Sequence, residues 1–212
     1  MKCIIFDLDG TLGNTLPLCI AAFKKAIEPL AGRSLSDREI VATFGPSEEG
    51  TVQALIPQHY DRGIEDYLLH YRELHGMCGA PFEGMRELLD RLREQNVRLA
   101  LVTGKGERST AITLELFGLD GYFEAVETGS PRGPRKTEGI RAVLERLGLT
   151  PAECIYVGDA PSDIEASRAA GVPVISAAWA ETAEPELLRP LEPDELFVTV
   201  AEFERYLERS IG

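Results

Sequence analysis

Short apolar runs, rich in β-branched residues, recur along the chain. They occupy residues 3–6, 97–102, 123–127, 154–157 and 172–176, with a possible last run at 196–198. Near-continuous apolar strands of this length suit a parallel sheet that is covered by helices on both faces. The pattern therefore predicts the strands of a parallel sheet.

Segments with helical periodicity separate these runs from residue 81 onward. They span residues 84–95, 109–118, 138–148 and 162–171. Gly118, Gly148 and Gly171 stand where a C-cap glycine is expected. Ser162 and Glu165 have the spacing of a capping box at the start of the last segment. Strand–helix alternation of this kind predicts an α/β fold with a Rossmann-like, doubly wound parallel sheet.

The stretch from Thr11 to about Gly79 breaks the alternation, because it carries helix signals and no convincing strand. Ser36 and Glu39 form a second capping box there. We predict a core of residues 1–13 and 80–212, with a helical cap domain of residues 14–79 inserted after the first strand. An inserted domain beside strand ends could serve as a lid. The alternative is a helical insertion without that role.

Composition limits the classes of partner. Apolar residues make up 44% and charged residues 27% of the 212 residues, which is typical of a globular protein. Asp and Glu number 35 against 22 Lys and Arg, a net charge of −13. Nucleic acids and anionic membranes select basic surfaces, so neither is expected as a partner. A small anionic substrate stays possible where a local cation or metal reverses the field.

The four cysteines form no close pair in the sequence. Cys3 and Cys154 begin apolar runs, so buried thiols are expected in place of disulfides. The amino terminus has only a very short apolar run before Asp7, unlike a signal peptide or a membrane anchor. We expect a cytoplasmic protein, whose oligomeric state the sequence does not indicate.

Acidic residues follow two of the apolar runs. Asp7 and Asp9 follow the first run, and Asp159 and Asp163 follow the fourth. Residues i and i+2 of an extended chain point the same way, and a turn at Gly10 could aim both carboxylates into a cleft. Four converging acids repel unless a cation lies among them, and oxygen ligands favour Mg²⁺. Alternatively, the acids are solvated or cap the following helices.

Groups that could hold an anion follow the other runs. Thr103 offers a hydroxyl, and Gly104 lets its backbone N–H approach a ligand closely. Gly10, in the loop after the first run, is a further candidate for such an approach. Lys136, in the loop after the third run, offers a positive charge to phosphate oxygens. Each of these residues is a weak signal alone. Together they indicate a phosphate site because of their positions in the chain.

Phosphoryl transfer would use these groups together. A carboxylate is ionised at neutral pH and can act as a nucleophile without a separate base. Asp7 could attack the phosphoryl group while the metal, Lys136 and Thr103 hold it. Asp9 could then give and take the proton of the leaving alcohol.

In these motifs the chain resembles the haloacid dehalogenase superfamily, specifically its phosphatases with a helical cap. The matching segments are DLDGT at 7–11, the threonine of LVTGK, Lys136, and GDAPSD at 158–163. The resemblance implies a Rossmann-like core, Mg²⁺ and an aspartyl-phosphate on Asp7. It also implies that Asp9 is the general acid and base and binds the metal through its backbone carbonyl. Asp159 and Asp163 would complete the metal site.

The chain departs from the family pattern in two places. Lys136 is followed by Thr137, where family members often have proline, and Lys105, Arg132 and Arg135 are rival phosphate partners. The segment after the first motif reads Gly-Asn-Thr at 13–15, where a hydrophobic residue, aspartate and serine or threonine are common. This difference could alter the hinge or the pocket that faces the cap.

Related activities are separated by single residues. Asp9 argues against a dehalogenase, which lacks the second aspartate. A β-phosphoglucomutase-like enzyme shares Asp9 but usually has a histidine shortly after the first motif, and here none is present. A catalytically silent binding module is the alternative from another class. We therefore predict a phosphatase of a small phosphorylated metabolite, close in layout to phosphoglycolate phosphatases and small pyrophosphatases.

The cap is expected to choose the substrate. Its candidate contact loop is residues 44–47, although a Gly-Pro turn there could be only a helix connector. The histidines all lie in the cap region and read as surface or packing residues. The identity of the leaving group cannot be read from this loop.

Overall fold

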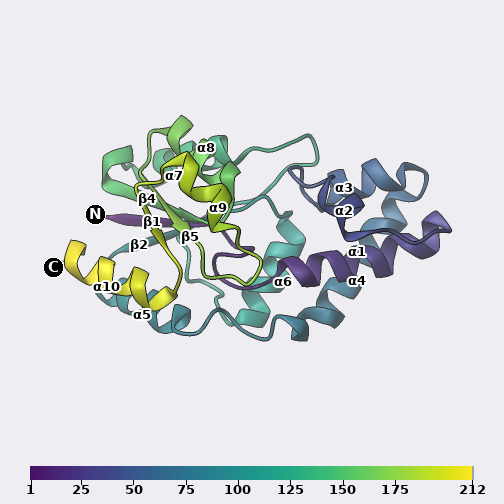
Figure 1. The fold of residues 1–212 in the computed structure, drawn as a ribbon, viewed down its shortest axis with the longest axis horizontal. Helices are drawn as coiled ribbons and strands as arrows, with labels where there is room; N and C mark the ends of the chain where they lie inside the picture. Colours follow the sequence, from purple (N-terminus) through teal and green to yellow (C-terminus); the bar gives the residue numbers. More distant parts are fainter. Residues whose placement is uncertain (212) are drawn as a thin grey trace.

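The computed structural model describes residues 1–211 and contains a parallel sheet with the strand order β3-β2-β1-β4-β5-β6 (Figure 1). The strands are β1 Cys3–Phe6, β2 Arg98–Val102, β3 Ala125–Glu127, β4 Cys154–Gly158, β5 Val174–Ala177 and β6 Glu195–Phe197. The core helices are α5 Met85–Glu94, α6 Glu107–Phe117, α7 Lys136–Leu147, α8 Pro161–Ala170, α9 Pro185–Leu188 and α10 Val200–Ile211. The α/β fold class predicted from the sequence is thereby confirmed.

Alternate residues of each central strand pack on opposite faces of the sheet. Ile4 and Phe6 of β1 belong to an apolar cluster with α5, α6 and α10. Cys3 and Ile5 belong to a second cluster with α7, α8 and α9. Because both faces are covered, the strands must be apolar throughout, which explains the unbroken hydrophobic runs.

The order of the strands places β1 at the point where the chain changes direction across the sheet. From β1 the chain moves outward to β2 and β3, and then returns to β4 on the other side of β1. Phe6 is in register with Leu101 of β2 and with Val157 of β4. The residues that follow all three strands therefore meet at one edge, where open α/β sheets bind ligands.

Between β1 and α5 the chain forms a helical insertion with its own apolar cluster, and its bounds at residues 14–79 stay a prediction. Its helices are α1 Leu16–Ala31, α2 Asp37–Val41, α3 Glu48–Leu55 and α4 Tyr60–Leu74. The rings of Phe23 in α1 and Tyr67 in α4 stack with their centroids 4.1 Å apart. The insertion lies at one end of the molecule, opposite the N-terminus (Figure 1).

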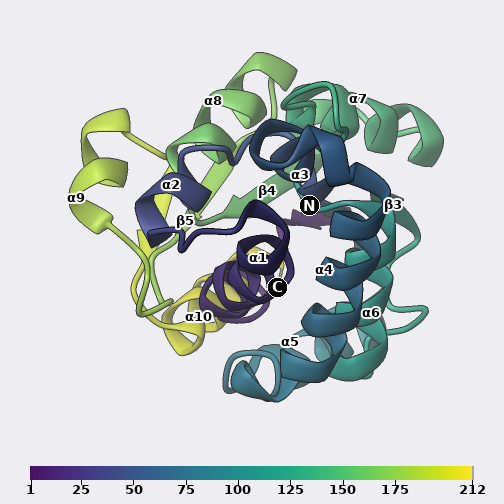
Figure 2. The ribbon, with the colours of Figure 1, turned by 90° about the vertical axis from the view of Figure 1, so that its right-hand side faces the viewer.

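Polar contacts connect the helical insertion to the core. α4 lies beside α6 (Figure 2), and the Tyr71 hydroxyl lies 2.7 Å from Thr113 Oγ1 in a buried hydrogen bond. Exposed ion pairs join Arg72 to Glu115 at 2.6 Å and Arg108 to Glu65 at 2.5 Å. A buried hydrogen bond and partly screened surface pairs therefore hold the two parts together.

Most local predictions agree with the structure, with one correction. Gly118, Gly148 and Gly171 are left-handed C-caps, and Ser36 with Glu39 forms a capping box. The predicted capping box of Ser162 and Glu165 is wrong, because α8 already begins at Pro161. At this helix the Asp163 carboxylate accepts the Ala160 N–H at 3.0 Å. Asp163 thus closes the first turn.

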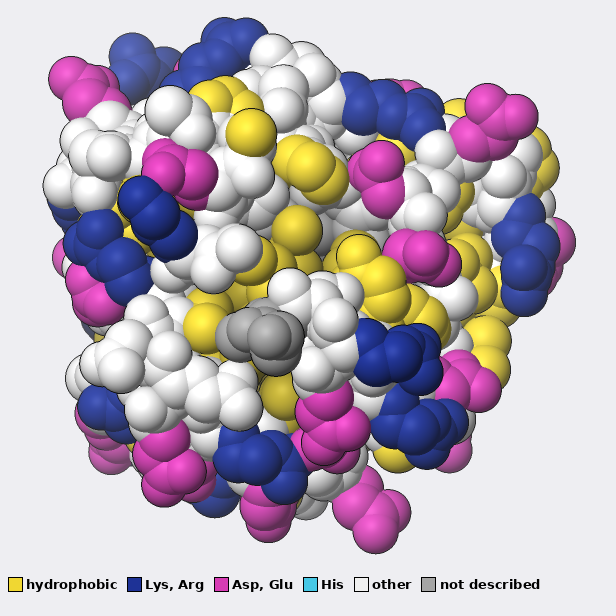
Figure 3. Space-filling view, turned by 90° about the vertical axis from the view of Figure 1, so that its left-hand side faces the viewer, with side chains coloured by type: hydrophobic (Ala, Val, Ile, Leu, Met, Phe, Trp, Pro, Cys, Tyr) yellow, Lys and Arg dark blue, Asp and Glu magenta, His cyan; other side chains and the backbone are white. Residues whose placement is uncertain are grey.

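Side-chain surroundings of other predicted residues were also as expected. All four cysteines are free, and Cys3, Cys19 and Cys154 are buried. His59 is exposed, whereas His75 is buried and packs against Phe117. Among residues 1–211, no helix has both the length and the apolar composition needed to cross a membrane. The face opposite the insertion has Lys and Arg side chains interspersed with Asp and Glu (Figure 3).

The packing of α10 on the sheet yields a test of the core. Phe203 is fully buried, with its ring 6.4 Å from that of Phe6 and 5.7 Å from that of Trp179. Phe203→Ala is expected to lower the free energy of unfolding by about 3–5 kcal/mol, because it opens a cavity. Urea unfolding followed by the fluorescence of Trp179 measures this change.

Leu187→Ala is the matched control, because Leu187 is 49% exposed. The control is expected to change the free energy of unfolding by less than about 0.5 kcal/mol. Equal losses in the two variants would contradict the packing described here.

Candidate active site

The loop after β1 presents Asp7 and Asp9 at the carboxyl edge of the sheet. Asp7 continues the pairing with β4, since its N–H donates to Val157 O at 2.9 Å. The loop then turns at Gly10, whose φ is +77°. A Cβ at this position would lie 2.0 Å from Asp159 Oδ2. Only glycine therefore allows the loop to pass so close to Asp159.

Three of the predicted acids converge at this edge. One carboxylate oxygen from each of Asp7, Asp159 and Asp163 lies within 4.8 Å of the others. Lys136, the first residue of α7, points its ammonium into the same group. Its Nζ lies 2.7 Å from Asp7 Oδ2 and 2.5 Å from Asp163 Oδ1. These four residues form what we call the acid cluster.

The Asp163 carboxylate is fixed by its hydrogen bonds. The Tyr156 hydroxyl donates to its Oδ1 at 2.8 Å, and Ala160 N–H donates to its Oδ2 at 3.0 Å. Gly158 leaves room for it, because a Cβ there would lie 2.4 Å from Asp163 Cγ. Sequence reasoning missed Tyr156, for which a hydroxyl in an otherwise apolar strand was the available signal.

The charges of the acid cluster disturb one another. Burial, with repulsion from Asp163 and Asp9, raises the pKa of Asp7 to about 7, even though Lys136 opposes the rise. Burial and the charges of Asp163 and Asp7 raise the pKa of Asp159 well above its usual range. Burial alone would lower the pKa of Lys136, but the charges of Asp163 and Asp7 raise it. The three carboxylates of the acid cluster therefore carry more negative charge than its single ammonium can balance.

The residues of the acid cluster fit a divalent metal ion. Asp7 Oδ1 is buried and has no hydrogen-bond partner among the described residues. Fully ionised, three carboxylates and one ammonium sum to −2, which a divalent cation would balance. The donors are carboxylate oxygens only, the ligand type that Mg²⁺ prefers. Asp7, Asp159 and Asp163 could therefore hold Mg²⁺.

The carboxylate of Asp9 lies apart from this cluster. Its Oδ1 accepts a hydrogen bond from the Thr15 hydroxyl and lies 3.3 Å from Lys105 Nζ. Thr15 is the N-cap residue of α1, so the acid is tied to the start of the helical insertion. Sequence reasoning noted Thr15 only within an unusual segment. Metal binding by the Asp9 backbone carbonyl stays a prediction.

Thr103 and Gly104 directly follow β2, and Gly104 lies close to Lys136. Thr103 is 2% exposed, and its Oγ1 accepts a hydrogen bond from Lys105 N–H at 3.2 Å. The Thr103 hydroxyl hydrogen is therefore free to be donated elsewhere. Gly104 has space above its Cα, since a Cβ there would meet only Lys136 Cε, at 3.9 Å.

Two of the rival cations, Lys105 and Arg135, have other partners. Lys105 is buried, and its Nζ lies 3.2 Å from Cys19 Sγ in addition to its ion pair with Asp9. Burial alone would lower the pKa of Lys105, but the charge of Asp9 raises it well above its usual value. Arg135 Nη2 lies 3.2 Å from Glu127 Oε2, and the Arg132 side chain is exposed. Of these cations, Lys136 is the one bonded to Asp7.

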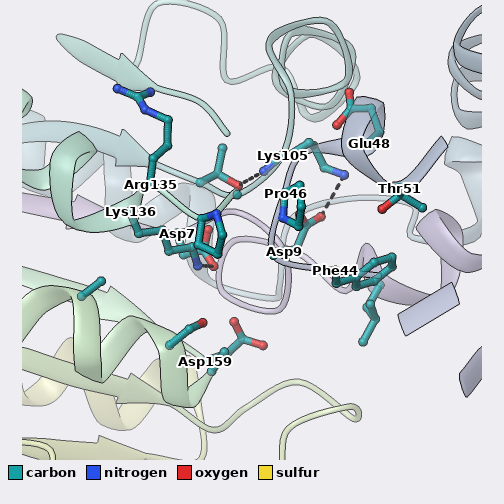
Figure 4. Close-up of a pocket in the computed structure, with 18 of the residues that line it drawn as sticks. Asp7, Asp9, Phe44, Pro46, Glu48, Thr51, Lys105, Arg135, Lys136 and Asp159 are labelled. Carbon is teal, nitrogen blue, oxygen red and sulfur yellow. Dashed lines mark hydrogen bonds and ion pairs between the residues drawn. The ribbon is translucent and has the colours of Figure 1, made fainter. Parts of the chain in front are cut away.

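A cavity of about 710 Å³ lies between the acid cluster and the helical insertion (Figure 4). Asp7, Asp9 and Asp159 line one side, and Phe44 and Glu48 of the insertion line the other. Glu48 was missed by sequence reasoning. Its Oε2 accepts Gly106 N–H at 2.6 Å, at the start of α6. Nothing in the sequence pairs these distant positions.

Comparisons with known proteins agree with this arrangement. The family described as haloacid dehalogenase-like hydrolase matches residues 4–177. Pyrophosphatase PpaX of Bacillus pumilus is 32% identical over 88% of this chain and 87% of its own length. A phosphoglycolate phosphatase of Thiobacillus denitrificans is 31% identical over 82% of each chain.

Solved structures share the fold. A crystal structure of a predicted phosphatase from Clostridium acetobutylicum has a TM-score of 0.80, with 20% identity and 98% of both chains covered. A predicted phosphoglycolate phosphatase from Haemophilus somnus has a TM-score of 0.77, with 23% identity and 98% coverage of both chains. The family match, the curated relatives and the fold agree: the chain belongs to the haloacid dehalogenase-like hydrolases.

Proposed function

We propose that this enzyme is a Mg²⁺-dependent phosphatase that hydrolyses a small phosphomonoester through an aspartyl-phosphate on Asp7. One observation carries the proposal. Asp7 has one oxygen bonded to Lys136 and the other without a partner, at the floor of a cavity and within a group of acids. The names of the two curated relatives, a pyrophosphatase and a phosphoglycolate phosphatase, support cleavage of a phosphorus–oxygen bond.

In the first step one oxygen of the Asp7 carboxylate attacks the phosphorus of the substrate. A bond forms between this oxygen and phosphorus while the bond from phosphorus to the alcohol oxygen breaks. The Lys136 ammonium donates hydrogen bonds to Asp7 and Asp163. Its third N–H therefore remains for a phosphate oxygen. The Thr103 hydroxyl and the Gly104 N–H would donate to the other phosphate oxygens.

Asp9 transfers the proton in both steps. Thr15 and Lys105 both contact its Oδ1, so its Oδ2 is left to protonate the leaving alcohol. Water then attacks the phosphorus, Asp9 takes up a proton, and inorganic phosphate leaves as the Asp7 carboxylate is restored. When bound, Mg²⁺ would supply positive charge to the phosphoryl oxygens and screen the acids from each other.

We propose that residues 14–79 act as a cap over this site. The insertion supplies the wall of the cavity that faces the acid cluster. Its contacts with the core include Ser47 N–H to Ser130 O at 3.0 Å, in addition to the Glu48 hydrogen bond. These few hydrogen bonds could break and form again as substrate enters, and a closed cap excludes water from the phosphoryl group.

Substituting the proposed nucleophile is the direct test. Asp7→Asn is expected to lower the release of inorganic phosphate from an aryl phosphate more than about 10³-fold, because the amide cannot form the ester. Asp9→Asn is expected to lower kcat about 10²–10⁴-fold through loss of proton transfer. Phosphate release is measured with and without Mg²⁺.

Asp120→Asn provides the control, because Asp120 is an exposed acid outside the cavity lining. This variant is expected to keep wild-type turnover. Metal-independent turnover that survives Asp7→Asn would contradict the proposal, and no turnover by the wild type would favour a binding module.

The charge of the acid cluster predicts how pH and metal affect stability. The pKa of Asp7 is raised to about 7 from 3.8, so the folded protein holds a proton that the unfolded chain has released in this window. The contribution of Asp7 to the stability of the metal-free protein is therefore lost as pH rises from about 4 to about 7. Mg²⁺ is expected to restore stability above pH 7 by binding the ionised form.

Asp159→Asn removes one of the repelling charges. At pH 8 without metal it is expected to raise Tm by about 2–4 °C, which corresponds to roughly 1 kcal/mol. It is also expected to weaken the stabilisation by Mg²⁺. Calorimetric scans with EDTA and with Mg²⁺ measure both effects, with Asp120→Asn as the control. Undiminished stabilisation of Asp159→Asn by Mg²⁺ would contradict this assignment of the metal site.

A further inference from the structure

The cavity is larger than a phosphoryl group needs, and its far wall is apolar. Leu16, Phe23, Val41, Phe44 and Tyr67 line it from the helical insertion. Val41 is 43% exposed and Phe44 is 36% exposed, so both leave apolar surface open to solvent at the cavity. An apolar ligand would cover this surface and gain free energy from its burial. We call these five residues the apolar wall.

Cations in the cavity are all occupied by neighbouring acids. Among the described residues, the basic ones in the lining are Lys105, Arg135 and Lys136. Lys105 pairs with Asp9 at 3.3 Å, and Arg135 pairs with Glu127 at 3.2 Å. Lys136 is bonded to the acid cluster. None of the three is therefore left for a second anionic group on the substrate.

Acids outside the acid cluster add negative charge to the lining. They are Asp9, whose charge Lys105 balances, and Glu48, Glu138 and Glu165. Glu48 is buried, and its Oε1 has no hydrogen-bond partner among the described residues. A divalent ion bound by the acid cluster would balance the charge there, but these three glutamates would remain. Glu138 and Glu165 are exposed to solvent, which screens their charge, whereas Glu48 places a buried carboxylate in the wall that the insertion contributes.

We propose that the natural substrate is the phosphate monoester of an uncharged, largely apolar alcohol, and that a second anionic group is selected against. This inference rests on the proposed function and names its substrate class. A carboxylate on the leaving group would have to shed its water without gaining a cation, and it would meet the glutamates. An aromatic or aliphatic group would instead pack on the apolar wall.

The proposed substrates differ in charge from those in the names of the two curated relatives. Phosphoglycolate carries a carboxylate next to the phosphate ester, and pyrophosphate carries a second phosphoryl group. Each would bring a further negative charge toward the apolar wall. Sequence identity of about 30% to those relatives leaves room for a different leaving group on the same chemistry.

Three esters with the same benzylic leaving oxygen provide the test. They are benzyl phosphate, 4-carbamoylbenzyl phosphate and 4-carboxybenzyl phosphate, and the last two differ in charge but hardly in size. At low ionic strength with Mg²⁺, kcat/KM for the carbamoyl ester is expected to exceed that for the carboxyl ester about tenfold or more. Benzyl phosphate is expected to be hydrolysed at least as well as the carbamoyl ester.

A variant with a new cation in the apolar wall makes the test specific. Val41→Lys is expected to raise the ratio of kcat/KM for the carboxyl ester to that for the carbamoyl ester about two- to fivefold. Leu69→Lys adds the same charge to the insertion at a site that is 54% exposed and outside the cavity lining. The control is expected to leave the ratio unchanged.

The outcomes separate this inference from the proposed function. Equal kcat/KM for the carboxyl and carbamoyl esters, or a preference for phosphoglycolate or pyrophosphate over benzyl phosphate, would overturn the substrate class and leave the phosphatase in place. Absence of Mg²⁺-dependent turnover with every phosphate compound would overturn both. Preference for the uncharged esters, with the ratio shifted by Val41→Lys alone, would support the inference.

Discussion

The site depends on placing two buried carboxylates, Asp7 and Asp163, beside a partly buried third, Asp159, and one ammonium. Burying charges is costly unless they are paired, and in the acid cluster Lys136 alone balances Asp7, Asp159 and Asp163. The parallel pairing of β1 with β4 enforces this proximity, because Phe6 and Val157 are in register one residue before Asp7 and Gly158. The sheet holds the acids together against their repulsion. A buried oxygen of Asp7 without a partner is the result.

Backbone geometry at two glycines makes this crowding possible. A side chain at Gly10 would overlap Asp159, and one at Gly158 would overlap Asp163. The apolar clusters on both faces keep the strands fixed, so the loops at the carboxyl edge cannot relax away. The stability of the sheet therefore keeps the mutually repelling acids close together. Phosphoryl transfer benefits from such a site, because its charged groups are already in place.

The sheet and the acids could be predicted from the sequence, because both leave local signals. The runs at β1, β2, β4 and β5 mark strands buried on both faces, and the polar residues after β1, β2 and β4 mark the edge where ligands bind. Contacts that depend on distant residues left no such signal. The hydrogen bonds of Tyr156 with Asp163 and of Glu48 with Gly106 join segments that only the fold brings together. α10, Val200–Ile211, was also not predicted, although its apolar positions at Val200, Phe203 and Leu207 have helical spacing.

The hydrogen bond from Gly106 to Glu48 has an evolutionary consequence. A Cβ at Gly106 would lie 2.6 Å from Glu48 Oε1, so a larger residue there is incompatible with the carboxylate in its present position. Replacement of Glu48 by a small residue would lift that restriction. Homologous sequences are therefore expected to exchange residues 48 and 106 in concert, and such covariation would record how closely each lineage docks its insertion against its core.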